Sequence, residues 1–211
     1  MIFVLCLLNY LLPMQRLILV DPNESLCTAW RTAFHAYPEV EVFPGRFEQV
    51  PDYDCMVSAA NSFGLMDGGV DLAIRNYFGA SLQERVQQII LAHYTGEQPV
   101  GTSFIVETQH PRHPFVAHTP TMRVPRPIHQ TENVYLAMKA MLEAVQAFNQ
   151  VQQRIQTVLC PGLGTATGRV PVEEAARQME LAYRFYKTPP QAISWPYAAA
   201  RNRSIVAGDY S

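Results

Sequence analysis

The chain has 211 residues, of which 48% are hydrophobic and 16% charged, and its formal net charge is −2. This length and apolar content predict one domain with one sizeable core. The charge balance excludes the broad basic surface that duplex nucleic acid requires, while single-stranded or modified nucleic acid stays open as a substrate. The four cysteines are far apart and form no metal-binding pattern, so we expect Cys55 and Cys160 to be reduced core residues of a cytoplasmic protein.

Residues 1–13 differ from the rest of the chain because they are almost wholly apolar. They are too short to span a bilayer and lack a basic n-region, so we interpret them as an over-extended start preceding a natural one at Met14. A secretory signal is the alternative, and it would overturn the cytoplasmic assignment. We expect a doubtful extension at 1–13, one domain at 14–190 and a tail at 191–211, in a monomer that does not bind membranes.

Strands and helices alternate along the chain. The apolar spacing predicts strands at 16–20, 39–43, 54–60, 102–108, 115–119 and 155–160, and helices at 23–36, 69–78, 81–94, 131–149 and 172–186. Three prolines predict an irregular surface excursion over 120–130. Residues 193–195 are predicted as an edge strand and the last dozen residues as loose. The alternation predicts a mixed sheet between helical layers, with the functional site at the carboxyl edge of its strands.

Residues 54–71 join a short apolar strand, which ends before Asn61, to a predicted helix through a loop that closes with Gly68-Gly69. Such loops bind phosphate in α/β proteins, because the first N–H groups of a helix are free and its dipole favours an anion. Glycine allows the backbone to approach the ligand closely. Asn61 and Asp71 add an amide and a carboxylate, which suit a sugar hydroxyl or a water.

Residues 155–171 repeat this arrangement. An apolar strand leads into a loop that contains Gly162, Gly164 and Gly168, and a helix begins after Pro171. Each loop alone also fits a tight turn with a purely structural role. The two loops together indicate a diphosphate held from both sides.

The order of three segments resembles the macrodomain family of ADP-ribose-binding modules. These segments are Ala59-Ala60-Asn61, Gly68-Gly69-Val70-Asp71 and the 161–171 loop, and the resemblance covers roughly residues 40 to 187. It implies an α/β fold, a three-layer α/β/α sandwich with a central mixed sheet. It also implies that the chain binds ADP-ribose or an ADP-ribosylated protein, and nothing in the sequence requires a metal or a cofactor.

The resemblance also implies roles for particular residues. Asn61 would hold the ribose remote from adenine, and Asp71 would orient a water against its anomeric carbon in a hydrolase that releases mono-ADP-ribosyl groups. The implied ligand-binding residues are Ala60, Gly68, Gly69, Val70, Gly162, Leu163, Gly164, Thr165, Ala166, Thr167 and Gly168, with Arg46 and Phe47 beside the base. As alternatives, Asn61 is a turn residue, Asp71 stabilises its helix, and the protein is a non-catalytic reader.

Three positions depart from the family pattern. Arg46 stands where the family has an Asp that holds the adenine amino group, and Ser58 stands where an Asn is common. Asp67 adds a carboxylate that would repel a diphosphate unless it points outward or pairs with Arg75 or Arg169. A different nucleotide therefore stays open as the ligand.

Four histidines cluster in sequence around a proline-rich stretch, namely His110, His113, His118 and His129. No carboxylate or thiol lies at a convincing ligand spacing from them, so we do not predict a metal site. By resemblance, His118 occupies a structural strand position.

Overall fold

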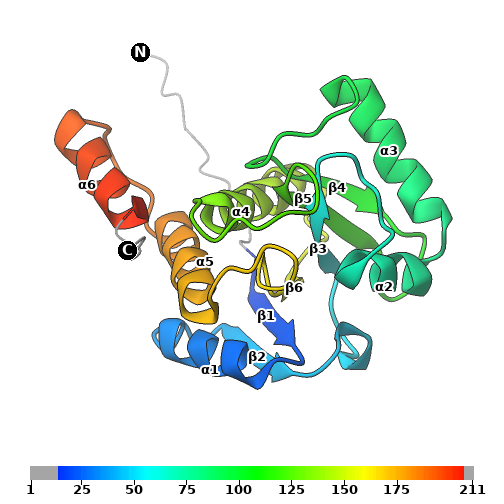
Figure 1. The fold of residues 1–211 in the computed structure, drawn as a ribbon, viewed down its shortest axis with the longest axis horizontal. Coiled ribbons are helices and arrows are strands. Elements are labelled where there is room, and N and C mark those ends of the chain that lie inside the picture. The colour runs from blue at the N-terminus through cyan, green and yellow to red at the C-terminus, as the bar shows by residue number, and fades with distance from the viewer. Residues whose placement is uncertain (1–13, 207–211) are drawn as a thin grey trace, which may run out of the picture.

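The computed structural model describes residues 14–206 and shows a three-layer α/β/α sandwich (Figure 1). The predicted extension at 1–13 lies outside the described residues. The strands are β1 (Arg16–Asp21), β2 (Val40–Pro44), β3 (Cys55–Asn61), β4 (Phe104–Glu107), β5 (Phe115–Met122) and β6 (Thr157–Pro161). The helices are α1 (Glu24–Ala33), α2 (Gly69–Phe78), α3 (Ser81–Tyr94), α4 (Asn133–Val151), α5 (Val172–Lys187) and α6 (Trp195–Val206), with a 3₁₀ turn η1 (Phe47–Gln49).

The six strands form one mixed sheet in the order β2-β1-β6-β3-β5-β4. All neighbouring pairs are parallel except β4 with β5, which is antiparallel. The predicted mixed sheet is confirmed. Because β1, β3 and β6 are parallel neighbours in its middle, their carboxyl ends meet at one edge.

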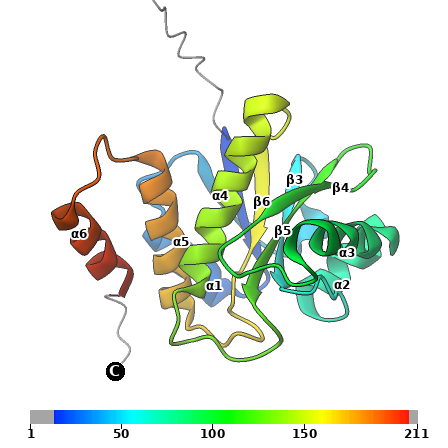
Figure 2. The same ribbon diagram turned by 90° about the horizontal axis from the view of Figure 1, so that it is seen from above.

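Helices cover both faces of the sheet, and strand periodicity distributes the core between them. Leu17 and Leu19 of β1 pack in the cluster beneath α1, α4 and α5, whereas Ile18 and Val20 pack on the opposite face against α2 and α3. Figure 2 shows these two helical layers on either side of the strands. Within residues 14–206, no helix is long and apolar enough to span a bilayer.

The prediction of an irregular excursion over 120–130 is wrong at its start. β5 continues through Pro120 to Met122, and all three residues there are buried. Proline fits because the β4 ladder ends at His118, so β5 has only β3 as a neighbour at this point, and the register shifts at Ala60/Asn61. Residues 123–130 do run over the surface, anchored by the buried side chain of Ile128.

The predictions for the end of the chain are also wrong as far as residue 206, and residues 207–211 lie outside the described part. Residues 193–195 form no strand, and α6 extends from Trp195 to Val206 through most of the stretch expected to be loose. None of its residues is buried, so it lacks the apolar stripe that identifies a helix in a sequence. Arg177 of α5 holds its end by donating hydrogen bonds to the carbonyls of Ser204 and Ile205.

Candidate ligand-binding site

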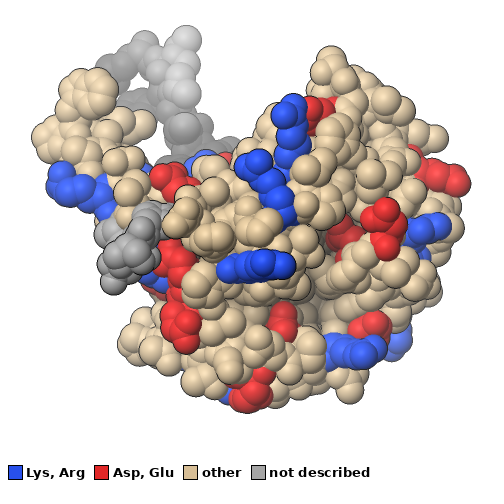
Figure 3. Space-filling model, viewed as in Figure 1, with Lys and Arg blue, Asp and Glu red and all other residues tan. Residues whose placement is uncertain are grey.

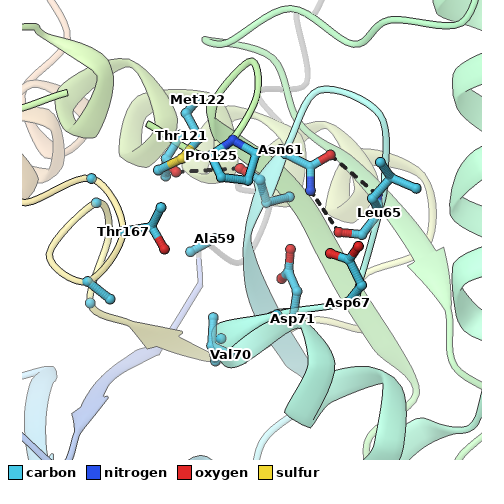
Figure 4. A pocket seen from close by; sticks show the side chains of 17 residues that line it. Ala59, Asn61, Leu65, Asp67, Val70, Asp71, Thr121, Met122, Pro125 and Thr167 are labelled. Atoms are coloured by element: carbon cyan, nitrogen blue, oxygen red, sulfur yellow. Dashed lines mark hydrogen bonds between the residues drawn. The ribbon is translucent and has the colours of Figure 1, made fainter. Parts of the chain in front are cut away.

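A cavity of about 280 Å³ opens at the carboxyl ends of β3 and β6, against the start of α2. Figure 4 shows its side chains converging from these elements. It is lined by Ala59, Ala60, Asn61, Leu65, Asp67, Gly68, Gly69, Val70, Asp71, Thr121, Met122, Pro125, Gly162, Gly164, Ala166, Thr167 and Gly168. The structure thus brings the two glycine-bearing loops together around one space.

The loop between β3 and α2 presents the start of a helix to the cavity. Gly68 is the N-cap of α2, so the N–H groups of Gly69 and Val70 have no partner within the helix. A Cβ added to Gly68 or Gly69 would meet no atom within 4 Å. Gly68 has an extended backbone that any residue adopts, so the fold does not require a glycine there. This openness favours the ligand interpretation of the first loop.

The loop between β6 and α5 is different, because its glycines are packed by the chain itself. A Cβ on Gly168 would lie 2.4 Å from the carbonyl oxygen of Gly164, and a Cβ on Gly162 would lie 2.7 Å from Oδ2 of Asp21. Gly164 has a φ of +71°. The fold itself therefore explains Gly164 and Gly168, whereas a Cβ at Gly162 would meet only the ends of side chains. Leu163 lines neither cavity, and its side chain is fully buried in the core.

Asp71 is buried at the first turn of α2 with its carboxylate at the cavity. Ser58 of β3 is fully buried, and its hydroxyl donates to Oδ1 of Asp71 across 2.6 Å. Burial raises the pKa of Asp71 to about 6, with the Asp67 charge adding to the rise and the Ser58 hydrogen bond opposing it. A carboxylate that titrates near neutral pH at the wall of a cavity suits a general base.

Asp67 faces the same space from the loop before α2. Figure 4 shows its carboxylate beside that of Asp71. Among residues 14–206 it forms no ion pair with Arg75 or Arg169. Neither arrangement that would remove its repulsion of a diphosphate is present. Asp67 is nevertheless exposed, so solvent screens its charge more than that of Asp71.

Asn61 lines the cavity, but its side chain is engaged by the loop that follows. Its Nδ2 donates to the carbonyl of Leu65 at 2.7 Å, and its Oδ1 accepts from the N–H of Leu65 (Figure 4). The same oxygen also accepts from the N–H of Phe63. These bonds form the turn proposed as its structural alternative. One N–H of the amide is left for a ligand.

A second cavity of about 440 Å³ adjoins the first. The two share Gly69, Val70, Gly162 and Ala166 in their walls, so they form one groove between the loops. Its remaining walls are Val20, Asp21, Pro22, Gly45, Arg46, Phe47, Glu48, Ala73, Pro161 and Thr165. Arg46 and Phe47 both line this second cavity, Arg46 exposed and Phe47 largely buried against Tyr77.

Sequence reasoning missed two sets of lining residues. Thr121, Met122 and Pro125 were hidden by the prediction that 120–130 leaves the fold. The sequence indicated for Asp21 only that a strand ends there and that a helix begins soon after. Its position at the carboxyl end of a central parallel strand was the available clue.

His113 and His118 are buried and contact other side chains of the core. His118 is fully buried in β5, its Nδ1 lies 2.6 Å from Oε1 of Gln98, and burial lowers its pKa to about 3. His113 stacks on Tyr53 with 3.8 Å between ring centroids. No group of three or more metal-ligating side chains occurs within the described part of the chain. Cys55 and Cys160 are buried free thiols, as expected.

Lysine and arginine side chains are interspersed with acidic ones on the face that carries the groove (Figure 3). This distribution agrees with the small net charge of the chain. This face therefore carries no broad field of one sign.

Comparison with known proteins identifies the family to which this chain belongs. The Macro domain model matches residues 57–179. An uncharacterised protein of Aquifex aeolicus is 33% identical over 142 residues, which cover 67% of this chain and 78% of that protein.

Solved structures share the fold at lower identity. The macrodomain of Mycobacterium tuberculosis DarG matches with a TM-score of 0.56 and 18% identity, covering 66% of this chain and 86% of that one. A variant macrodomain of Oceanobacillus iheyensis with ADPR matches with a TM-score of 0.56 and 21% identity, covering 74% and 86%. The family model and the Aquifex aeolicus relative together show that the chain belongs to the Macro domain family.

Proposed function

We propose that this chain binds ADP-ribose along the groove formed by the two cavities. The supporting observation is the pair of loops that meet at Gly69, Val70, Gly162 and Ala166, where the cavities join. A diphosphate at this junction lies against the free N–H groups at the start of α2. A similar structure from Oceanobacillus iheyensis contains ADPR.

The two cavities differ in chemistry, and this difference orients the ligand. The first carries the carboxylate of Asp71 and the amide of Asn61, and we assign it to the distal ribose. The second has apolar walls from Val20, Phe47 and Ala73, and we assign it to the base.

The proposed reaction is hydrolysis of a mono-ADP-ribosyl linkage or of a related ADP-ribose derivative. Asp71 accepts a proton from a water that attacks the anomeric carbon of the distal ribose. The bond from that carbon to the acceptor breaks, the acceptor oxygen or nitrogen keeps the electron pair, and the proton held by Asp71 passes to it. The pKa near 6 leaves most Asp71 side chains deprotonated at neutral pH while retaining basicity. The loops hold the diphosphate so that the water and the carbon stay in line. This chemistry requires no metal and suits a cytoplasmic monomer.

One observation favours a second candidate, a non-catalytic reader of ADP-ribose. The turn uses the carbonyl oxygen and one N–H of Asn61, so few of its hydrogen-bonding groups remain for a reacting ribose.

Turnover by the Asp71→Asn variant separates the two candidates. A mono-ADP-ribosylated protein is incubated with the wild-type chain and the variant, and released ADP-ribose is measured. Hydrolysis by the wild type and a loss of about 100-fold or more in the variant support the enzyme. Binding of ADP-ribose by both proteins with no release by either supports the reader.

A further inference from the structure

Asp21 places a carboxylate in the cavity assigned to the base. It ends β1, is half-buried, and lines this cavity together with Arg46 and Glu48. Within residues 14–206 no lysine, arginine or histidine forms an ion pair with it. Its hydrogen-bonding capacity toward the cavity is therefore not consumed by a cation of the chain.

The chain holds this carboxylate in a defined position. Oδ1 accepts the N–H of Asn23 at 2.9 Å, in the turn that leads into α1. On the other side, Oδ2 lies so close to Gly162 that a Cβ there would be 2.7 Å away. Gly162 thus makes room for the carboxylate beside the junction of the two cavities. A fixed acceptor discriminates better than a mobile one, because little ordering entropy is lost on binding.

We propose that Asp21 accepts a hydrogen bond from the exocyclic amino group of the base and so selects an amino-bearing purine. The proposal rests on the proposed function. Position 46 carries an arginine and no carboxylate. Asp21, at the end of the neighbouring strand β1, supplies a carboxylate to the same cavity.

The physical basis is that a carboxylate only accepts hydrogen bonds. An amino group of the base donates to it, whereas a carbonyl at the same ring position presents lone pairs to lone pairs. Rejection then costs both the lost bond and the desolvation of two unpaired acceptors. In this arrangement the apolar side chains of Val20 and Ala73 contact the plane of the base. The exposed guanidinium of Arg46 lines the same cavity and has no ion-pair partner within residues 14–206.

The test compares ADP-ribose with inosine diphosphate ribose, which has a carbonyl in place of the amino group and an N–H at the adjacent ring nitrogen N1. Calorimetric titrations use the full chain, the Asp21→Asn variant and the Glu48→Gln variant as a matched control. Asparagine keeps an acceptor for the N–H of Asn23 and replaces one acceptor by a donor. Glu48 is an exposed carboxylate in the wall of the same cavity.

We expect the wild type and Glu48→Gln to bind ADP-ribose about tenfold or more tightly than the inosine analogue. In Asp21→Asn the preference falls below about threefold or reverses. Equal binding of both nucleotides by the wild type, or an unchanged preference in Asp21→Asn, overturns the role of Asp21 and leaves the proposed function standing. No binding of either nucleotide by the wild type overturns both.

Discussion

Ser58 and Asp71 share a hydrogen bond of 2.6 Å that joins the middle of β3 to the first turn of α2. Both residues are buried, so this bond sits in a low-dielectric wall where its effect on the carboxylate is large. It orients Asp71 toward the cavity and favours the ionised form against burial.

Replacing Ser58 by alanine is expected to shift the pH dependence of hydrolysis. Without the hydroxyl donor the pKa of Asp71 rises further, by about one unit for a hydrogen bond to a charged group. The acidic limb of the pH profile of kcat then moves to higher pH, so kcat falls strongly near pH 6 and much less at pH 8. A kcat lowered equally at every pH would contradict this role and indicate a packing defect.

Asp71→Asn is expected to stabilise the ligand-free protein at neutral pH. A carboxyl whose folded pKa is raised from 3.8 to about 6 favours folding below pH 4, and this contribution is lost as the pH rises through 6. At pH 7 to 8 the ionised Asp71 therefore costs up to about 3 kcal/mol, which the amide avoids. Urea unfolding at pH 4.5 and pH 7.5 measures the difference. A variant that is less stable than the wild type at pH 7.5 would be inconsistent with this account.

Gly68→Ala separates ligand binding from folding. The added methyl group meets no protein atom and the backbone is extended, so we expect the free energy of unfolding to change by less than about 1 kcal/mol. The methyl group enters the first cavity beside the N–H groups at the start of α2 that hold the diphosphate, and the affinity for ADP-ribose falls about tenfold or more. Calorimetry and thermal melts measure the two effects.

Gly168→Ala provides the contrast. Its methyl group would lie 2.4 Å from the carbonyl oxygen of Gly164, so the loop must shift. We expect a loss of about 1–3 kcal/mol or more in stability. If Gly168→Ala folds as well as Gly68→Ala, the packing account of the second loop is wrong.

Arg201→Ala is expected to loosen α6 without affecting the groove. The guanidinium of Arg201 lies 4.1 Å from the ring centroid of Phe185 and donates to the hydroxyls of Tyr135 and Tyr197. The Tyr197 bond lies within α6, and since α6 buries none of its residues, the contacts of Arg201 with Phe185 and Tyr135 join the Arg177 hydrogen bonds in attaching it to the domain. Hydrogen exchange over 195–206 is predicted to quicken while the affinity for ADP-ribose stays unchanged. Equal protection in the variant would place the attachment elsewhere.

The layers of the fold were predictable because its core obeys simple periodicity. The predicted bounds of α2 and α3 equal the observed ones. Both helices have clear apolar stripes, and neither has a glycine or a proline in its interior. Pro120 defeated prediction because its tolerance in β5 depends on where β4 ends, which no local pattern encodes. Likewise α6 has no buried apolar stripe to detect in the sequence, because it is attached by the contacts of Arg201 and by the hydrogen bonds from Arg177.

The site was predictable in its loops but less so in its individual roles. Glycine spacing located both loops, yet only the structure distinguishes Gly68, which is open, from Gly168, which the chain itself packs. The hydrogen bond from Asn61 to the carbonyl of Leu65 is evident only in the structure. Asp21 reaches the groove through the pairing of β1 with β6, a contact between strands more than a hundred residues apart.

A calorimetric titration of the full chain with ADP-ribose, with Asp71→Ala in parallel, tests the central claim most directly. The account predicts saturable one-site binding by both proteins, because the diphosphate is held by backbone N–H groups that the substitution leaves in place. An absence of binding by both proteins, confirmed by the lack of any thermal shift, would contradict the assignment of ADP-ribose to the groove.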